Sequence, residues 1–413
     1  MSNQPTTDTW LDGAEKRLGD FLSDLIRFDT SNPPGRNYRG CADFLAKKLR
    51  SLGFTTTIHE VPEEVLAPTL PGAAEFPRFT VIGRWDVGAP KTVHFNAHYD
   101  VVPAGPGWTT PAFAPAIRKG WLYGRGANDM KGSIAALCGA LESLRSLKLE
   151  PNMNVEIAFV PDEESNSLLG TGYLVEQKWH RADCAVVCEG GFGDMVGCGH
   201  NGVIWMEVTV KGKSAHASRP HLGVNAFEMA AALCRELGKY KTRIRRHVFT
   251  APGGEKMRPP LTLGGEVRGN GGAKINTIPD EFTFTIDRRV LPDETVSEVE
   301  KELRATMRAA CQKIPGLKIA VRKISSRKAS LVKESDPLPQ AFLQTVKQYR
   351  NRAGFGMTSG FTDMAFYANE ARLPCVGYGV GGKNTHGIDE CVKVAELVEV
   401  AKIYARFLTT AQL

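Results

Sequence analysis

The residues best suited to chemistry in this chain are carboxylates and histidines that stand in short motifs between positions 98 and 386. They are His98 and Asp100 in HYD, Asp129 in ANDM, Glu163 and Glu164 in PDEE, Glu189 in CEG, and His386 in NTHG. Carboxylate oxygens and imidazole nitrogens are the ligands that a zinc-like divalent cation takes. A set that also leaves one spare carboxylate as a base is what a two-metal hydrolase requires. The residue types therefore predict metal-assisted hydrolysis.

His98 and Asp100 follow an expected strand at 92–97 and are separated by one residue. Period-two geometry places both side chains on one face of that strand. A histidine that binds a metal commonly donates its other ring proton to a nearby acceptor, and Asp100 is placed to accept it. The alternative is a strand-end turn with an unrelated aspartate.

The other candidates also allow two interpretations when each is taken alone. Asp129 precedes an expected helix at 131–147, where it could bridge two cations or cap the helix. The adjacent carboxylates Glu163 and Glu164 repel unless a positive charge or a proton lies between them. One could bind a metal while the other acts as general base, or the pair could be a solvated acidic turn. Glu189 and His386 are, singly, compatible with structural roles.

Strands alternate with helices along the first half of the chain, which predicts an α/β fold. We expect a catalytic domain with a mostly parallel sheet that helices cover on both faces. The expected helices lie at 11–26, 39–52, 131–147, 339–350 and 392–408, and the expected strands at 55–59, 79–84, 92–97, 155–160, 185–187 and 376–379.

The pattern changes near Gly202. A strand at 203–211, a helix at 224–237, strands at 261–267 and 281–288, a helix at 296–311 and a strand at 317–322 follow in order. This βαββαβ order is that of a ferredoxin-like unit. Because it falls between Glu189 and His386, we predict an inserted domain at 200–323 and a discontinuous catalytic domain at 1–199 and 324–413.

Size and composition favour a globular protein of two domains. The chain has 413 residues, a net charge of +7, 42% hydrophobic and 23% charged residues. A basic run at 239–246 fits a solvated helix end, and no aromatic interleaving accompanies it, so no nucleic-acid partner is expected. No apolar run is long enough to span a membrane, so no membrane partner is expected. Nine cysteines in mostly apolar contexts favour buried thiols and a cytoplasmic location.

Three motifs together resemble the M20 family of metallopeptidases and amidohydrolases. They are HYDVVP at 98–103, GRGANDMKG at 124–132 and the Glu163–Glu164 pair. The family includes acetylornithine deacetylase, succinyl-diaminopimelate desuccinylase, aminoacylase and glutamate carboxypeptidase, and the resemblance extends from DTSNPPG at 29–35 to His386. It implies that His98, Asp129 and Glu189 hold one divalent cation and that Asp129, Glu164 and His386 hold the other. It also implies that Glu163 is the general base and that Asp100 orients His98. Zinc is the expected metal, with cobalt and manganese as alternatives.

The resemblance gives the insert the roles of a lid and of a homodimer contact. In GKSAHASRP at 212–220, His216 matches a histidine that reaches the site of a partner subunit to stabilise the oxyanion. Asn276 and Arg288 match lid positions that bind the substrate carboxylate. For Arg288 the alternative is a surface salt bridge.

One departure from the family bears on the substrate. After SGFTD at 359–363, several family members carry an arginine that meets the acyl or carboxylate end, whereas this chain has Met364, Ala365 and Phe366. A succinyl group is therefore disfavoured, and an apolar or small acyl group is favoured. The expected activity is hydrolysis of the amide bond of an N-acyl amino acid or a similar small carboxylate-bearing amide. A dipeptidase or carboxypeptidase, an ammonia-releasing aminohydrolase and a catalytically inactive metal-binding protein are the alternatives, the last opposed by the presence of Glu163.

Overall fold

The computed structural model describes residues 6–69, 75–190, 194–269 and 274–413. The chain forms two compact units. The first comprises Met1–Gly199, Val332–Thr358 and Thr362–Leu413, and the second comprises His200–Leu331 and Ser359–Phe361.

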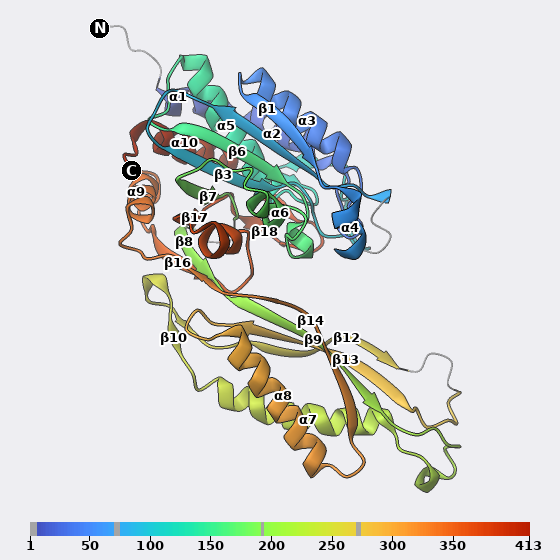
Figure 1. The fold of residues 1–413 in the computed structure, drawn as a ribbon. Coiled ribbons are helices and arrows are strands. Elements are labelled where there is room, and N and C mark those ends of the chain that lie inside the picture. The colour runs from blue at the N-terminus through green and yellow to red at the C-terminus, as the bar shows by residue number, and fades with distance from the viewer. Residues whose placement is uncertain (1–5, 70–74, 191–193, 270–273) are drawn as a thin grey trace. The chain divides into compact units, whose positions relative to one another are not determined.

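The first unit is built on a large mixed sheet in the order β1-β2-β6-β3-β7-β17-β8 (Figure 1). Its strands are β1 (Thr55–Glu60), β2 (Phe79–Trp85), β3 (Thr92–His98), β6 (Asn154–Val160), β7 (Cys184–Val187), β8 (Met195–His200) and β17 (Cys375–Gly377). The four central strands, β6, β3, β7 and β17, are parallel. β1, β2 and β8 are antiparallel to their neighbours, so the prediction of a mostly parallel sheet holds only for the centre. Helical crossovers, which parallel pairing requires, connect β3 to β6 and β6 to β7.

Helices bury the central strands. α5 (Lys131–Leu147), α10 (Val394–Thr410) and α2 (Glu15–Ile26) pack together, and α3 (Tyr38–Ser51) packs against β1 and β2. α2 and α5 approach closely because Gly139 has no side chain: a Cβ there would lie 2.4 Å from Leu18 Cδ2. These contacts hold α5, which begins two residues after Asp129.

A small sheet in the order β18-β19-β5-β4 joins two distant parts of the first unit. Its strands are β4 (Ala116–Arg118), β5 (Trp121–Tyr123), β18 (Gly382–Lys383) and β19 (Cys391–Lys393). β19 pairs with β5 in antiparallel register. The sheet therefore ties the segment before Asp129 to the segment around His386.

The remaining described elements of the first unit are short. They are α1 (Thr7–Asp12), α4 (Glu63–Thr69), η2 (Glu163–Ser165), α6 (Thr171–Glu176), α9 (Pro337–Val346), β16 (Gly354–Thr358) and η5 (Phe366–Ala371). All nine cysteines are free thiols, and most are buried, as their apolar contexts predict. In the part of the chain that the structure describes, no helix has the length and apolar character needed to cross a membrane.

The second unit has an antiparallel sheet in the order β12-β13-β9-β14, with two helices on one face. Along the chain the elements are β9 (Gly202–Lys211), α7 (Ala226–Ile244), β12 (Leu261–Gly269), β13 (Glu281–Val290), α8 (Val296–Lys313) and β14 (Lys318–Arg327). A short hairpin of β10 (Phe249–Thr250) and β11 (Lys256–Met257) lies in the connection from α7 to β12. β14 stays paired with β9 as far as Arg327, so the predicted domain boundary at residue 323 falls inside a strand.

Candidate metal centre

Three adjacent parallel strands deliver candidate side chains to one edge of the large sheet. His98 is the last residue of β3, Glu164 follows β6 in the short helix η2, and Glu189 follows β7. In open α/β sheets, ligands bind outside the carboxyl ends of the parallel strands. Asp129, before α5, and His386, in the loop after β18, complete the group from outside the sheet.

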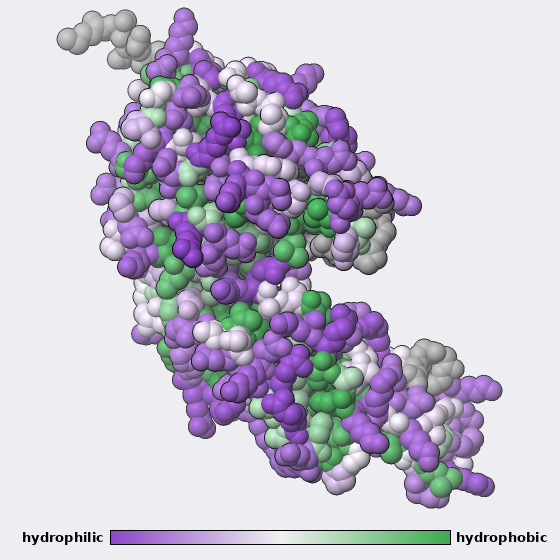
Figure 2. Space-filling view, in the orientation of Figure 1, coloured by the Kyte–Doolittle hydropathy of each residue, from purple (hydrophilic) through white to green (hydrophobic). Residues whose placement is uncertain are grey.

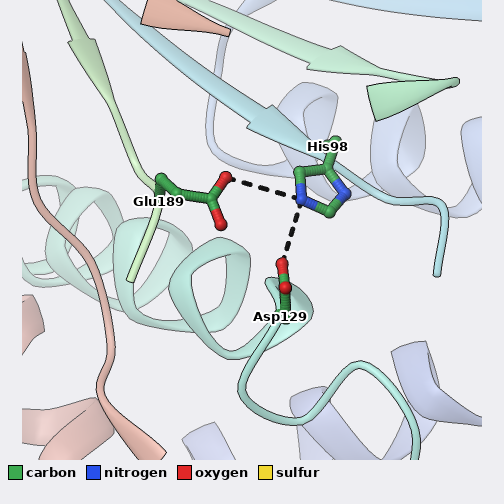
Figure 3. A group of neighbouring side chains, drawn as sticks. All are labelled: His98, Asp129 and Glu189. Atoms are coloured by element: carbon green, nitrogen blue, oxygen red, sulfur yellow. Dashed lines mark hydrogen bonds and ion pairs between the residues drawn. The ribbon is translucent and has the colours of Figure 1, made fainter. Parts of the chain in front are cut away.

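The first set of side chains, called here the inner group, consists of His98, Asp129 and Glu189 (Figure 3). The Nε2 atom of His98 lies 3.2 Å from Asp129 Oδ1 and 3.6 Å from Glu189 Oε2. The His98 side chain is 1% exposed. One ligand atom from each residue lies within 4.8 Å of the others, which is close enough for all three to hold one metal ion.

The second set, the outer group, consists of Asp129, Glu164 and His386. The Nε2 atom of His386 lies 3.1 Å from Asp129 Oδ2 and 3.2 Å from Glu164 Oε2. Asp129 thus uses a different oxygen in each group, as a bridging carboxylate would. The His386 side chain is 51% exposed, so the outer group is the one that faces solvent.

The electrostatics of these groups fit positive ions. Glu164 Oε1 and Glu189 Oε2 are buried and have no hydrogen-bond partner among the described residues. Burial, aided by the charge of Asp129, raises the pKa of Glu189 to about 8. Hydrogen bonds to Asp129 and Glu164 raise the pKa of His386 to about 10. The negative potential of these carboxylates, which favours the protonated form of a nearby imidazole, would also attract a divalent cation.

The ring of His98 is held by Asp100, although through the backbone carbonyl of Asp100 and not through its carboxylate. His98 Nδ1 lies 3.0 Å from the carbonyl oxygen of Asp100 and 3.5 Å from its carboxylate. Because a carbonyl oxygen only accepts, Nδ1 carries the proton, and Nε2 is left free to face the inner group. The Asp100 carboxylate instead accepts hydrogen bonds from the backbone N–H groups of Glu163 and Glu164, each at 3.2 Å. Asp100 therefore connects His98 to the turn that carries the acidic pair.

Glu163 lies beside this site with a strongly perturbed carboxyl group. Burial raises its pKa well above the usual value, the charges of Glu189 and Glu164 act in the same direction, and His98 opposes them. A positive ion in either group would lower this pKa again. The side chain is half-buried, which leaves it accessible to a small reactant.

Sequence reasoning missed the residues that brace this site. Asn32 donates from Nδ2 to Asp100 at 2.9 Å and to Asp162 at 3.0 Å, and Arg78 pairs with Asp162 at 2.9 Å. Glu390 accepts the backbone N–H of Asp129 at 3.0 Å. Asn32 lies in the DTSNPPG segment, where the family resemblance begins, whereas nothing in the local sequence around Glu390 indicated its role.

The predicted residues of the second unit lie apart in two environments. His216 and Asn276 are both exposed, and Asn276 Nδ2 lies 3.4 Å from His216 Nε2. Arg288 is fully buried, on the helix-covered face of the sheet, where its guanidinium pairs with Glu294 at 2.5 Å. Its neighbour Arg289 lies on the opposite face, is half-buried and pairs with Asp287 at 3.0 Å.

Known proteins are similar to this chain in sequence and in fold. The model of peptidase family M20/M25/M40 matches residues 94–410. A succinyl-diaminopimelate desuccinylase of Acidovorax ebreus is 28% identical over 380 residues, which cover 89% of this chain and 92% of the relative.

Two solved structures show the same fold at low sequence identity. Human carnosine dipeptidase 1 is similar with a TM-score of 0.75 and 17% identity, over 97% of this chain and 98% of the other. A Bacillus subtilis protein described as a dinuclear metal-binding peptidase of the M20 family is similar with a TM-score of 0.65 and 14% identity, over 96% and 98% of the chains. The chain is a metal-dependent hydrolase and belongs to peptidase family M20/M25/M40.

Proposed function

We propose that the protein is a deacylase that hydrolyses the amide bond of an N-acyl amino acid or a similar small amide that carries a carboxylate. The observation that supports this proposal most directly is the pair of three-residue groups that share Asp129, with the spare carboxylate of Glu163 beside them. A shared ligand and a separate base are the two requirements of two-metal amide hydrolysis.

In this proposal the inner and outer groups each hold one divalent cation, and zinc is the expected metal. The mixed oxygen and nitrogen donors fit zinc, cobalt and manganese. The buried oxygens of Glu164 and Glu189 that have no hydrogen-bond partner among the described residues fit such a ligand set. When bound, the two cations polarise the scissile carbonyl group and make a water reactive at neutral pH.

The remaining steps belong to the protein's own residues. Glu163 takes a proton from the attacking water and delivers it to the leaving nitrogen. Asp100 holds the protonated Nδ1 of His98 through its carbonyl and holds the turn before Glu163 through its carboxylate. A side chain in a fixed orientation needs no reorganisation during the reaction, which favours the transition state.

We assign the substrate carboxylate to Asn276 and to an arginine of β13, with Arg289 preferred over Arg288. Arg288 is fully buried beside Glu294, so binding a substrate there would require a buried ion pair to break. Arg289 is half-buried and on the sheet face away from α7 and α8, where a planar guanidinium can still take a carboxylate.

The acyl group in this proposal is small or apolar. Met364, Ala365 and Phe366, which follow the SGFTD segment, are all buried. This segment supplies no cation for a second carboxylate, so a succinyl group would be poorly recognised there.

We further propose that the second unit is an inserted ferredoxin-like lid that also forms a homodimer. β14 is an edge strand, and a cavity of about 540 Å³ lies between it and α8, lined by Met307, Cys311, Leu317, Ile319 and Val321 among others. Figure 2 shows hydrophobic surface in this region of the unit. An exposed strand edge beside apolar side chains suits pairing with a second copy of the chain. In such a dimer, His216 would stabilise the developing oxyanion in the partner's site, an effect typically worth about 3–4 kcal/mol.

A substrate panel tests the proposed reaction. Zinc-reconstituted protein is assayed with N-acyl amino acids, dipeptides and ammonia-releasing amides, and acid, amine and ammonia are measured separately. We expect the highest kcat/KM with small or apolar acyl groups and a lower value with succinyl. Highest kcat/KM with dipeptides would instead favour a dipeptidase, which the fold shared with carnosine dipeptidase 1 makes the second candidate. Ammonia as the product would replace both with an aminohydrolase.

A further inference from the structure

We propose that Glu390, acting with Arg125, is a positioning residue for the outer cation, because it fixes the separation of the two chain segments that bind this cation. The inference rests on the proposed two-metal function and concerns residues that neither bind a cation nor contact the substrate.

Glu390 is fully buried, and its carboxylate is surrounded by donors from one turn of the chain. Oε1 accepts hydrogen bonds from the backbone N–H groups of Asn128 at 2.8 Å and Asp129 at 3.0 Å. Oε2 accepts from the N–H of Gly126 at 3.2 Å and from Nη1 of Arg125 at 2.6 Å. The turn that presents the bridging carboxylate of Asp129 is thus wrapped around one buried anion.

Arg125 extends the same network to the other ligand segment. Its Nη2 atom donates to the carbonyl oxygen of His386 at 3.2 Å, and its guanidinium lies 5.1 Å from the ring centre of Trp108. The arginine side chain is 1% exposed. One carboxylate and one guanidinium therefore link the backbone of Asp129 to the backbone of His386.

The loop that carries His386 needs such support. Asn384, His386 and Asp389 all have left-handed backbone conformations, with φ values of 58°, 60° and 56°. Non-glycine residues keep this conformation only where their surroundings impose it. Besides Arg125, a hydrogen bond of 2.6 Å from Asn128 to Thr385 Oγ1 holds the loop.

The inner group depends less on this network than the outer group does. His98 ends β3 and Glu189 follows β7, so two of the three inner ligands are fixed by the large sheet. In the outer group, Asp129 and His386 are both held through Glu390 or Arg125. Disturbing the network should therefore weaken the outer cation first.

The test is titration of metal-free protein with Zn²⁺ against a chromophoric chelator, with metal content measured after dialysis. We expect the unaltered protein to bind two ions per chain. Glu390→Gln, which keeps the size of the side chain but loses its charge, should bind one of them about 10- to 100-fold more weakly and the other nearly unchanged, as happens when a group that orients a ligand is replaced. Arg125→Lys keeps the buried charge but cannot bind both Glu390 and the carbonyl oxygen of His386. It should weaken the binding of the same ion.

A matched control is Arg84→Lys, which alters another arginine–glutamate pair of the first unit, Arg84 Nε to Glu156 Oε2 at 2.7 Å, in which the arginine is partly exposed. Arg84→Lys should leave both zinc affinities unchanged. A general loss of stability would instead lower the zinc affinities of all three variants alike. The proposal is overturned if Glu390→Gln binds both ions as tightly as the unaltered protein or weakens both equally. Should that variant not fold, Arg125→Lys decides by the same criterion. Fewer than two ions on the unaltered protein would instead contradict the proposed two-metal function.

Discussion

Replacing Glu163, the proposed general base, is the most direct test of the proposed chemistry. Glu163→Gln preserves the size of the side chain, and the backbone N–H of residue 163 can still bind Asp100 Oδ1, which it meets at 3.2 Å. Removal of a general base typically lowers the rate 10²- to 10⁴-fold, which corresponds to about 2.7–5.5 kcal/mol of transition-state free energy. We expect kcat to fall by this factor with zinc content unchanged.

The same substitution should stabilise the metal-free protein. Burial raises the pKa of Glu163 well above its usual value, and the charges of Glu189 and Glu164 raise it further. Above the unfolded pKa of about 4.3, the folded protein then holds a proton that the unfolded chain has lost, so the free energy of unfolding falls as pH rises. Each pKa unit of this shift corresponds to about 1.4 kcal/mol. Glutamine removes the penalty, so the variant should gain stability at pH 8 and almost none at pH 4.

Urea unfolding of chelator-treated protein at pH 4 and pH 8 measures this difference, and steady-state kinetics of the zinc form measures the rate. The control is Glu176→Gln, which removes an exposed glutamate of the same unit and should change neither quantity. Near-normal kcat in Glu163→Gln would refute its role as base. Loss of a cation together with loss of activity would place Glu163 among the metal ligands. Equal stability of Glu163→Gln and the unaltered protein at pH 8 would refute the argument that burial raises the pKa of Glu163.

Three further outcomes follow from the structure. Asp100→Asn should lower the free energy of unfolding by about 2–4 kcal/mol. The two backbone N–H groups bind different oxygens of the carboxylate, and in asparagine one of these oxygens is replaced by an NH2 group that cannot accept. An unchanged urea midpoint would contradict this. Arg288→Met should lower the free energy of unfolding by up to about 3 kcal/mol, the lower end of the range for a buried pair, because Glu294, whose side chain is 19% exposed, loses its partner. Arg289→Met should raise KM and change stability little. The reverse pattern in unfolding and kinetics would return the substrate role to Arg288. Burial lowers the pKa of His200 to about 4. As the pH falls from 6.5 to 4, the unfolded chain therefore binds a proton that the folded protein does not bind, and the free energy of unfolding should fall by up to about 3 kcal/mol. His200→Gln should flatten this pH dependence in urea titrations.

The convergence of the candidate ligands could be predicted from the sequence because it follows from strand direction. His98, Glu164 and Glu189 each come at or just after the carboxyl end of a predicted strand, and the structure makes these strands parallel neighbours in the order β6-β3-β7, of which β6 and β7 are mostly apolar. Parallel strands that are buried on both faces appear in the sequence as nearly continuous apolar runs, which are easy to detect. Burial does not reveal strand direction, because β2 and β8 are also buried along nearly their whole length although each is antiparallel to a neighbour. This is why their pairings, and that of β1, were not predicted.

The face of β13 on which Arg288 lies could also be predicted from the sequence, although the match to the family motif suggested a role in substrate binding. β13 alternates, with Phe284 and Ile286 buried against the helices, so the residue two positions on must face the same core. Arg288 is that residue, and β13 continues to Val290, two residues past the predicted strand end. Strand periodicity therefore separates two adjacent arginines that a motif match alone treats as equivalent.

Glu390 had no such signal, and the reason is physical. Its partners are mainly backbone N–H groups of residues 126, 128 and 129, and every residue except proline offers the same donor. The strands that bring the two segments together, β5 and β19, have three residues each, too few to show a period. A sequence reports which side chains can bind a cation, but the distance between two ligand segments depends on contacts whose partners have no distinctive residue type. Residues that set such distances must therefore be sought among buried charges that satisfy the backbone, as Glu390 does next to Asp129, the carboxylate common to both groups.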